Sequence, residues 1–124
     1  MEKNRTILIV DDEPNIVMSL EYAFKKQGYE VFIARDGVEA LEIARTQLPD
    51  AILLDIMMPE MDGYQALQAI RSMEELSETK VLFLTAKSKS SDIEKGLKLG
   101  VDQYLTKPFS MKKVIQEVEQ LLEK

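Results

Sequence analysis

The sequence predicts a single α/β domain, spanning residues 1–124, in which a parallel β-sheet carries helices on both faces. Two observations lead to this class. First, short runs of β-branched and aliphatic residues alternate five times with segments whose apolar residues recur at helical spacing. Second, the runs are almost continuously apolar, which is typical of strands buried on both faces. Alternating strands and helices are connected by right-handed crossovers in a doubly wound sheet.

The first strand is expected at Thr6–Val10, a run of β-branched and aliphatic residues. Pro14 then suits the first turn of a helix, with Asp12 as its expected N-cap and Gly28 at its end. The alternating segment Tyr29–Ala34 is the second expected strand.

The next helix is expected at Gly37–Gln47, and Pro49 stops it. Its predicted apolar stripe is Val38, Leu41, Ile43 and Ala44. The remaining strands are expected at Ala51–Leu54, Val81–Leu84 and Val101–Leu105. The residues expected to face inward from the three remaining helices are Ala66, Leu67 and Ile70, then Ile93 and Leu97 before Gly100, and finally Val114, Val118, Leu121 and Leu122 after a cap at Ser110.

Composition excludes several kinds of chemistry. The chain has no cysteine and no histidine, which removes disulfides, thiolate and imidazole metal ligands and the commonest general base. No apolar run is long enough to span a bilayer, and the first residues do not resemble a signal peptide, so we expect a cytoplasmic protein without membrane contact. The net charge of −6 argues against direct binding of nucleic acid.

Polar residues follow four of the expected strands. Asp11, Asp12 and Glu13 follow the first strand, Asp55 follows the third, Thr85 ends the fourth, and Lys107-Pro108 follows the fifth. In doubly wound sheets, functional groups gather just past the carboxyl ends of the strands. We therefore expect these side chains to meet at one edge of the sheet.

Asp11, Asp12 and Asp55 offer only hard oxygen ligands, which suit Mg²⁺ and also Mn²⁺. Carboxylates gathered without a cation repel each other. The alternative for Asp11 and Asp12 is helix capping, and for Asp55 a capping role at a strand end. Asp55 follows an apolar strand, where a carboxylate has little structural use.

Together these groups suit phosphoryl transfer to a carboxylate. Asp55 would be the nucleophile, and Lys107 and Thr85 would bind the phosphoryl oxygens. The alternatives are a surface lysine before a turn and an ordinary hydroxyl at a strand end.

The motifs VDDE, LLDIMMPEMDG, FLTA and YLTKPF together resemble the receiver domain of bacterial two-component response regulators, over essentially the whole chain. The resemblance implies a CheY-like, flavodoxin-like (βα)5 sandwich with strand order 2-1-3-4-5. It implies these roles: acidic metal ligands at Asp11 and Asp12, the phospho-acceptor and a metal ligand at Asp55, a ligating backbone carbonyl at Met57, the conserved hydroxyl and lysine at Thr85 and Lys107, a cis bond at Lys107-Pro108, a switch aromatic at Tyr104, and acceptor-loop residues at Pro59 and Gly63.

The resemblance also implies a signalling domain rather than an enzyme, one that catalyses only its own phosphorylation and slow dephosphorylation. The donor would be a histidine kinase, a phosphotransfer protein or a small acyl phosphate. The output would be a protein partner at the face formed by the fourth helix, fifth strand and fifth helix, with the domain a monomer or a phosphorylation-dependent dimer. No output domain is expected within these residues, and both a stand-alone protein and a piece of a longer regulator remain open.

Lysines are concentrated in residues 87–113, a stretch of charge +4 in a chain whose remainder carries −10. The stretch overlaps the expected output face, so we predict an acidic partner; the alternative is a solvated face. For Tyr104 the alternative to a switch is a half-buried tyrosine with its hydroxyl in water.

Three other interpretations fit the sequence less well. A haloacid-dehalogenase-type phosphatase needs its nucleophile on the first strand with an aspartate two residues later, where this chain has Glu13. A flavodoxin-like FMN protein needs a phosphate loop rich in donors, where this chain has DDEPN. A receiver that works without phosphorylation is disfavoured because all five acid, hydroxyl and lysine positions are present.

Overall fold

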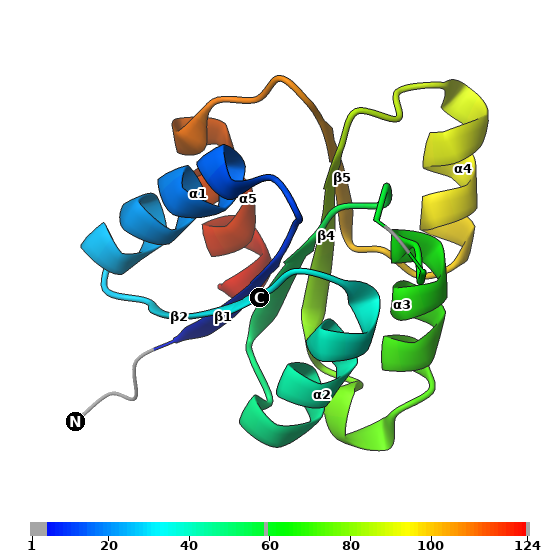
Figure 1. Ribbon diagram of the computed structural model, residues 1–124, viewed down its shortest axis with the longest axis horizontal. Coiled ribbons are helices and arrows are strands. Elements are labelled where there is room, and N and C mark those ends of the chain that lie inside the picture. Colours follow the sequence, from blue (N-terminus) through cyan, green and yellow to red (C-terminus); the bar gives the residue numbers. More distant parts are fainter. Residues whose placement is uncertain (1–4, 59, 124) are drawn as a thin grey trace.

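The computed structural model describes residues 5–58 and 60–123, in which five parallel strands form one sheet in the order β2-β1-β3-β4-β5 (Figure 1). Pro59 of the predicted acceptor loop lies outside the described residues. The elements are β1 (Thr6–Val10), α1 (Pro14–Lys26), β2 (Glu30–Ala34), α2 (Gly37–Gln47), β3 (Ala51–Leu54), α3 (Gly63–Arg71), the 3₁₀ turn η1 (Glu74–Leu76), β4 (Lys80–Thr85), α4 (Ser90–Lys98), β5 (Gln103–Thr106) and α5 (Met111–Leu122). The predicted fold class and strand order are confirmed.

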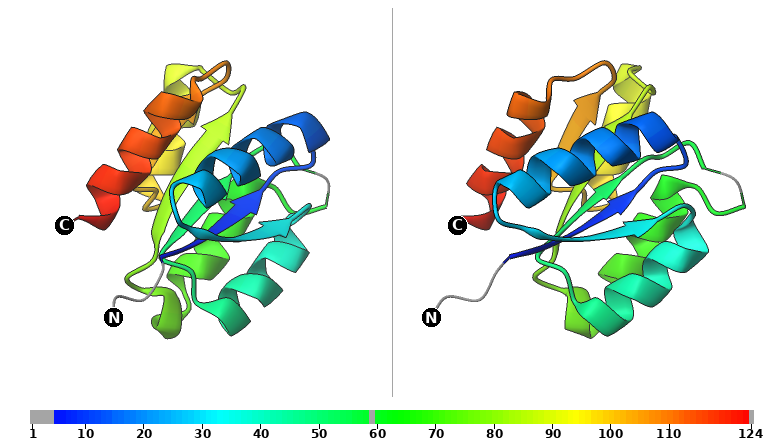
Figure 2. Two further views of the ribbon diagram at one scale, coloured as in Figure 1. Left: turned by 90° about the vertical axis from the view of Figure 1, so that its left-hand side faces the viewer. Right: turned by 60° about the vertical axis from the view of Figure 1, so that its left-hand side comes forward.

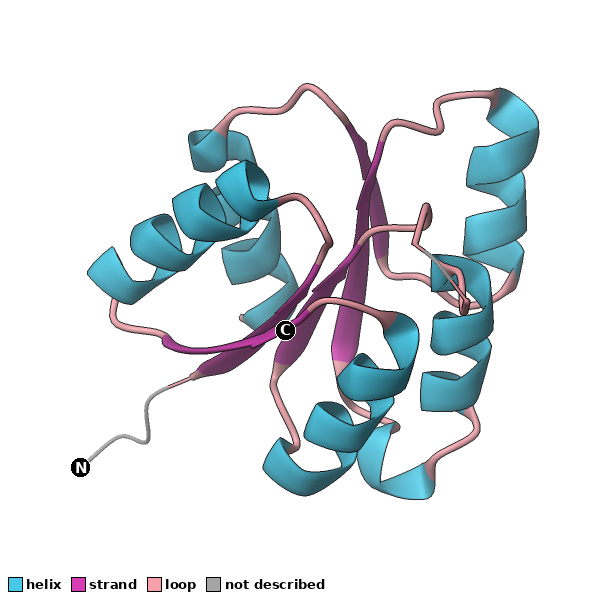
Figure 3. Cartoon of the chain, viewed as in Figure 1, coloured by secondary structure: helices cyan, strands magenta, loops and turns pink. Residues whose placement is uncertain are grey.

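The sheet separates two hydrophobic layers. Helices α1 and α5 cover one face, and α2, α3 and α4 lie on the other (Figure 1). Residues of β1, β3 and β4 alternate between the two layers, as Ile7 and Leu8 do in β1. These three central strands are almost completely buried, which explains their continuous apolar sequence. Figure 3 shows the strands as a single layer between the helices.

The carboxyl ends of the central strands lie side by side. Val10 at the end of β1 pairs with Ala34 of β2 and with Leu54 of β3, and Thr85 of β4 pairs with Thr106 of β5. The arrowheads visible in Figure 2 fan out with the twist of the sheet and point toward the same end of it. This register brings the polar residues that follow each strand to a common edge.

Four details of the sequence prediction are wrong. Glu13, not Asp12, is the N-cap residue of α1, and it makes no side-chain capping bond. Val38 is 54% exposed, because α2 packs through Gly37, Ala40 and Ala44 instead. Of the predicted stripe on α2, Ala44 is buried and Leu41 and Ile43 pack against the core, so only Val38 was misplaced.

Leu97 was expected to face inward but is 54% exposed. The contact of α4 with the sheet is made by Gly96, where an added Cβ would lie only 3.0 Å from the Phe83 ring and 3.3 Å from the Tyr104 ring. Glycine permits this close approach because it has no side chain. A hydropathy pattern does not mark glycine as a residue that faces the core, so it does not predict this contact. The last strand also starts later than predicted, at Gln103. The Asp102 carboxylate just before it accepts a hydrogen bond from the amide of Val81.

No helix among the described residues is both long and apolar enough to cross a membrane.

Candidate phosphoryl-acceptor site

The four expected groups lie just beyond the strand ends. Asp11 follows β1, Asp55 follows β3, Thr85 is the last residue of β4, and Lys107 follows β5. Asp11 and Asp55 are only 3% and 4% exposed, and Thr85 is fully buried. A parallel sheet places such residues together because its strand ends coincide at one edge.

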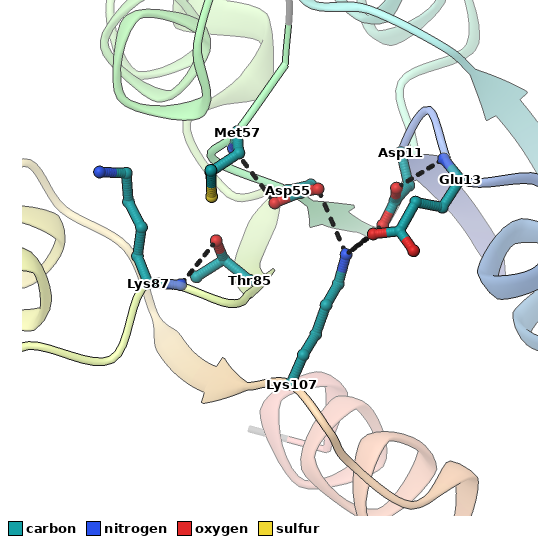
Figure 4. A network of polar contacts seen from close by, with 7 residues as sticks. All are labelled: Asp11, Glu13, Asp55, Met57, Thr85, Lys87 and Lys107. Atoms are coloured by element: carbon teal, nitrogen blue, oxygen red, sulfur yellow. Dashed lines mark hydrogen bonds and ion pairs between the residues drawn. The ribbon is translucent and has the colours of Figure 1, made fainter.

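Lys107 joins the acids of two strands. Its Nζ lies 3.1 Å from Asp11 Oδ2 and 3.3 Å from Asp55 Oδ2 (Figure 4). It also lies 2.9 Å from Glu13 Oε1, the shortest of the three contacts. The lysine side chain is 14% exposed, so water screens these ion pairs much less than it would at the surface.

The main chain fixes the other oxygen of each buried aspartate. Asp11 Oδ1 accepts a hydrogen bond from the Glu13 amide at 2.9 Å, and Asp55 Oδ1 accepts one from the Met57 amide at 3.1 Å. Each carboxylate is thus held between a backbone amide two residues later and the Lys107 ammonium. The same local turn follows β1 and β3, and it orients both acids.

Asp11, Asp12 and Asp55 each offer a carboxylate oxygen within 4.8 Å of the other two. Asp12 is exposed while the other two are buried. This donor set consists of hard oxygens with an open side, which fits an oxygen-liganded divalent cation such as Mg²⁺. The Met57 side chain is 56% exposed, and ligation by its backbone carbonyl stays a prediction.

The pKa values of Asp11 and Lys107 both lie above their ordinary values, for different reasons. Burial raises the pKa of Asp11, and the nearby charge of Asp55 adds to the increase, while its bonds to Glu13 and Lys107 oppose it. Burial lowers the pKa of Lys107, but the bond to Glu13 and the charges of Asp55 and Asp11 outweigh it and hold the pKa above its ordinary value. Lys107 is therefore firmly protonated at neutral pH.

The acceptor segment rests on a tightly fitted helix start. Asp62 caps α3, with its side chain accepting from the Gln65 amide and the Gln65 side chain accepting in return. A Cβ at Gly63 would lie 2.6 Å from Ile56 Cα and 2.7 Å from the Asp55 carbonyl oxygen. Only glycine fits here, which gives the Gly63 predicted from the motif a packing role directly beneath Asp55.

Thr85 and Tyr104 are linked through one residue. Thr85 Oγ1 accepts a hydrogen bond from the Lys87 amide at 3.3 Å, and the Tyr104 hydroxyl donates to the Lys87 carbonyl at 2.8 Å. The Tyr104 ring also packs edge-on against Phe83, with centroids 5.7 Å apart. In this conformation the Tyr104 side chain is half-buried and its hydroxyl is bonded to the protein backbone. No hydrogen bond within residues 5–58 and 60–123 joins the Thr85 hydroxyl to Asp55.

Glu13 is the site residue that sequence reasoning missed. It was noted as the third acid after β1 but received no role, since acids at the start of a helix usually favour the helix dipole. The run of three acids opposite a lysine was the available signal. The Lys107-Pro108 peptide bond is cis, as the resemblance implied.

Comparison with known proteins agrees with this arrangement. The family model for the response regulator receiver domain matches residues 7–119. A curated relative, the alkaline phosphatase synthesis transcriptional regulatory protein PhoP of Bacillus subtilis, is 44% identical over 119 residues. That match covers 96% of this chain and 49% of PhoP, so the chain spans about half the length of this relative.

Solved structures with the same fold include a putative response regulator from Chloroflexus aurantiacus, with a TM-score of 0.92 and 34% identity over 98% of this chain and all of the other. Another is the receiver domain of the sensor histidine kinase PA1611 from Pseudomonas aeruginosa, with a TM-score of 0.90 and 32% identity over 98% of this chain and 100% of the other. That structure has a magnesium ion coordinated in its active site cleft. Sequence, fold and strand-end residues agree, and the chain belongs to the response regulator receiver domain family of two-component systems.

Proposed function

We propose that Asp55 accepts a phosphoryl group and that the domain passes this signal on by contact with another protein. The observation that carries the proposal is the position of Lys107, whose ammonium contacts the buried carboxylates that follow β1 and β3. A buried lysine shared between two acids is poised to bind an anion formed on one of them.

In the proposed reaction, an Asp55 carboxylate oxygen attacks the phosphorus of a phosphohistidine or a small acyl phosphate. A new O–P bond forms, and the P–N or P–O bond to the donor breaks, with its electron pair leaving on the donor. A carboxylate nucleophile carries no proton that must be removed, so this step requires no general base, which agrees with the absence of histidine from the chain.

Asp11, Asp12 and Asp55 are the residues that would hold Mg²⁺, or Mn²⁺, together with the Met57 carbonyl. When bound, the cation would screen the negative charge of the incoming phosphoryl group. Lys107 would supply a second positive charge from the carboxyl end of β5, at the same edge of the sheet, and the Thr85 hydroxyl would supply one hydrogen-bond donor. The remaining requirement is positioning, which the backbone bonds of Met57 and Glu13 to the buried aspartates support.

The switch would pass through Lys87. If Thr85 turns its hydroxyl to a phosphoryl oxygen, it releases the Lys87 amide, while Tyr104 holds the Lys87 carbonyl. Loss of this hydrogen bond would free the segment between β4 and α4 to shift. The shift would in turn alter the face formed by α4, β5 and α5. This is a local change of hydrogen bonding coupled to a packed aromatic side chain.

A hollow of about 470 Å³ beside the site offers a place for the phosphoryl donor. Its walls come from α1 and from the connection between β5 and α5, and include Ile16, Pro108, Phe109 and the site residue Lys107. An apolar surface next to the reacting group suits a histidine kinase or phosphotransfer protein. A donor bound there would bring its phosphohistidine close to Asp55.

We further propose a cytoplasmic location and a protein partner with acidic surface groups. Several lysines of the 87–113 stretch, including Lys89, Lys98 and Lys112, are exposed near the proposed output face. Lys107 belongs to the acceptor site instead, and the Lys95 ammonium lies 4.3 Å from the centre of the Tyr64 ring. Binding that is insensitive to ionic strength would contradict the electrostatic part of this proposal.

The test is exposure of the purified chain to acetyl phosphate with Mg²⁺, followed by intact-mass measurement. We expect the added mass of one phosphoryl group in the parent and none in Asp55→Asn, because an amide is a poor nucleophile. Asp50→Asn is a matched control, since Asp50 directly precedes β3 as Asp55 follows it, and its Oδ2 accepts a hydrogen bond from the Thr6 amide at the far edge of the sheet. Equal phosphorylation of the Asp55 variant would reject Asp55 as the acceptor.

A further inference from the structure

Lys107 has as many carboxylate partners as it has donors. An ammonium carries three N–H groups. Its Nζ contacts carboxylate oxygens of Glu13, Asp11 and Asp55 at 2.9, 3.1 and 3.3 Å (Figure 4). Binding a phosphoryl oxygen therefore requires Lys107 to give up or share one of these contacts.

The three partners differ in what else they do. Asp11 and Asp55 both belong to the acidic group that suits a divalent cation. Asp55 also loses its carboxylate charge in the proposed reaction, since one of its oxygens becomes an ester oxygen. Its contact with Lys107 is also the longest of the three. Glu13 lies outside that acidic group and undergoes no chemical change.

We propose that Glu13 is a positioning residue for Lys107, holding the ammonium over the acceptor oxygens while Asp55 changes from a carboxylate to an acyl phosphate. This inference rests on the proposed function and deepens it. The contact with Asp55 passes to the phosphoryl oxygen, and the contact with Glu13 remains. Glu13 is suited to this role because it is the N-cap residue of α1, and its amide is bonded to Asp11 Oδ1.

The contact is more than an ordinary surface ion pair. The Glu13 side chain is 57% exposed, and exposed pairs contribute little because water screens them. Its partner, however, is 14% exposed and is held from two other directions. The lysine therefore loses little additional conformational freedom when it binds Glu13.

The experiment measures the affinity of the Mg²⁺-loaded chain for beryllofluoride, a phosphoryl mimic, in Glu13→Gln and Glu13→Ala. We expect affinity to fall about threefold to fivefold in Glu13→Ala, the range for a partly exposed ion pair, and less in Glu13→Gln, which keeps an acceptor oxygen. Glu21→Gln is the matched control: it removes the same charge from the same helix, but Glu21 pairs with Lys25. Circular dichroism checks that each variant is folded.

The double variant with Lys107→Gln separates positioning from simple repulsion. Removal of the Glu13 charge alone reduces repulsion of an anion, which should tighten binding slightly. In the Lys107→Gln background we therefore expect the Glu13 substitution to leave affinity unchanged or to raise it, the reverse of its effect in the parent. Weakening of the same size in both backgrounds would overturn the proposal.

A second readout is the NMR signal of the lysine ammonium in the beryllofluoride-bound state, assigned by its loss in Lys107→Gln. A hydrogen-bonded signal that weakens in Glu13→Ala, but not in Glu21→Gln, supports the positioning role. If the Glu13 variants match the Glu21 control in both beryllofluoride affinity and the ammonium signal, the positioning role of Glu13 is rejected. If the parent itself takes up neither beryllofluoride nor phosphoryl from acetyl phosphate, the proposed function fails instead.

Discussion

Lys107 balances the charges of the acceptor site. It is the cation that contacts both Asp11 and Asp55, which are 3% and 5% exposed as side chains. Removing one partner of a buried ionic group leaves an uncompensated charge, which destabilises a protein much more than the intact group stabilises it. The residue with the proposed phosphoryl-binding role is therefore also a stability determinant.

We predict that Lys107→Met lowers the free energy of unfolding by about 3 kcal/mol at neutral pH. The folded-state pKa of Lys107 lies above its ordinary value of 10.5, so the stabilisation that Lys107 provides is complete below about that pH and is lost as pH rises through the folded-state pKa. The difference between parent and variant in urea unfolding should thus shrink above pH 10.5. Lys98→Met, at an exposed position, is the control, and a constant difference across this range would contradict the prediction.

At the scale of elements, two helices depend on glycines where they meet the sheet. Helix α3 begins at Gly63, which leaves no space for a side chain above the backbone of Asp55 and Ile56. Helix α4 uses Gly96 against Phe83 and is otherwise little buried, with no other fully buried residue among those described in the helix. A helix with so few buried side chains is the element most easily displaced, which suits its place in the proposed switch.

We predict that Gly63→Ala destabilises the fold by about 1–3 kcal/mol, because the added methyl overlaps backbone atoms that cannot move independently. It should also slow phosphorylation by acetyl phosphate, since the clash is with the carbonyl of the acceptor residue itself. Gly28→Ala provides the comparison. That glycine has φ +93° and open space around it, so alanine adds backbone strain far from the site. Equal phosphorylation rates in the two variants would show that the Gly63 contact does not shape the acceptor.

Within residues 5–58 and 60–123, three acids gather closely enough to hold a metal ion, and they do so at the acceptor site. Asp11, Asp12 and Asp55 converge within 4.8 Å, and their repulsion opposes folding unless cations balance it. Lys107 neutralises part of this charge, and Asp12 remains exposed beside it. A divalent cation bound at this edge of the sheet should therefore increase the free energy of unfolding of the whole domain.

We predict that Mg²⁺ raises the urea midpoint of the parent, by an amount equivalent to about 2.7 kcal/mol at a concentration one hundred times the dissociation constant. Asp12→Asn should lose most of this response. Without Mg²⁺ the variant should be at least as stable as the parent, because one repelling charge is gone. NaCl at matched ionic strength controls for screening. A parent that responds equally to both salts would show that no specific cation site exists.

The sequence by itself determined the order of strands and helices along the chain, because apolar periodicity reflects burial and each element carries its own pattern. It also placed Asp11, Asp55, Thr85 and Lys107 at one edge, since parallel strands end together. It could not place Val38 or Leu97, because helix orientation depends on close contacts such as those of Gly96, which hydropathy does not record.

Only the tertiary structure decided which groups share the lysine. Lys107 lies 94 residues from Glu13 and 96 from Asp11 along the chain, so their contacts follow from the path of the fold and have no local signature. The same holds for Thr85 and Tyr104, which meet at the backbone of Lys87. Local patterns fix what each segment becomes, whereas hydrogen bonds between side chains depend on positions to within a few tenths of an ångström, which only the packed molecule sets.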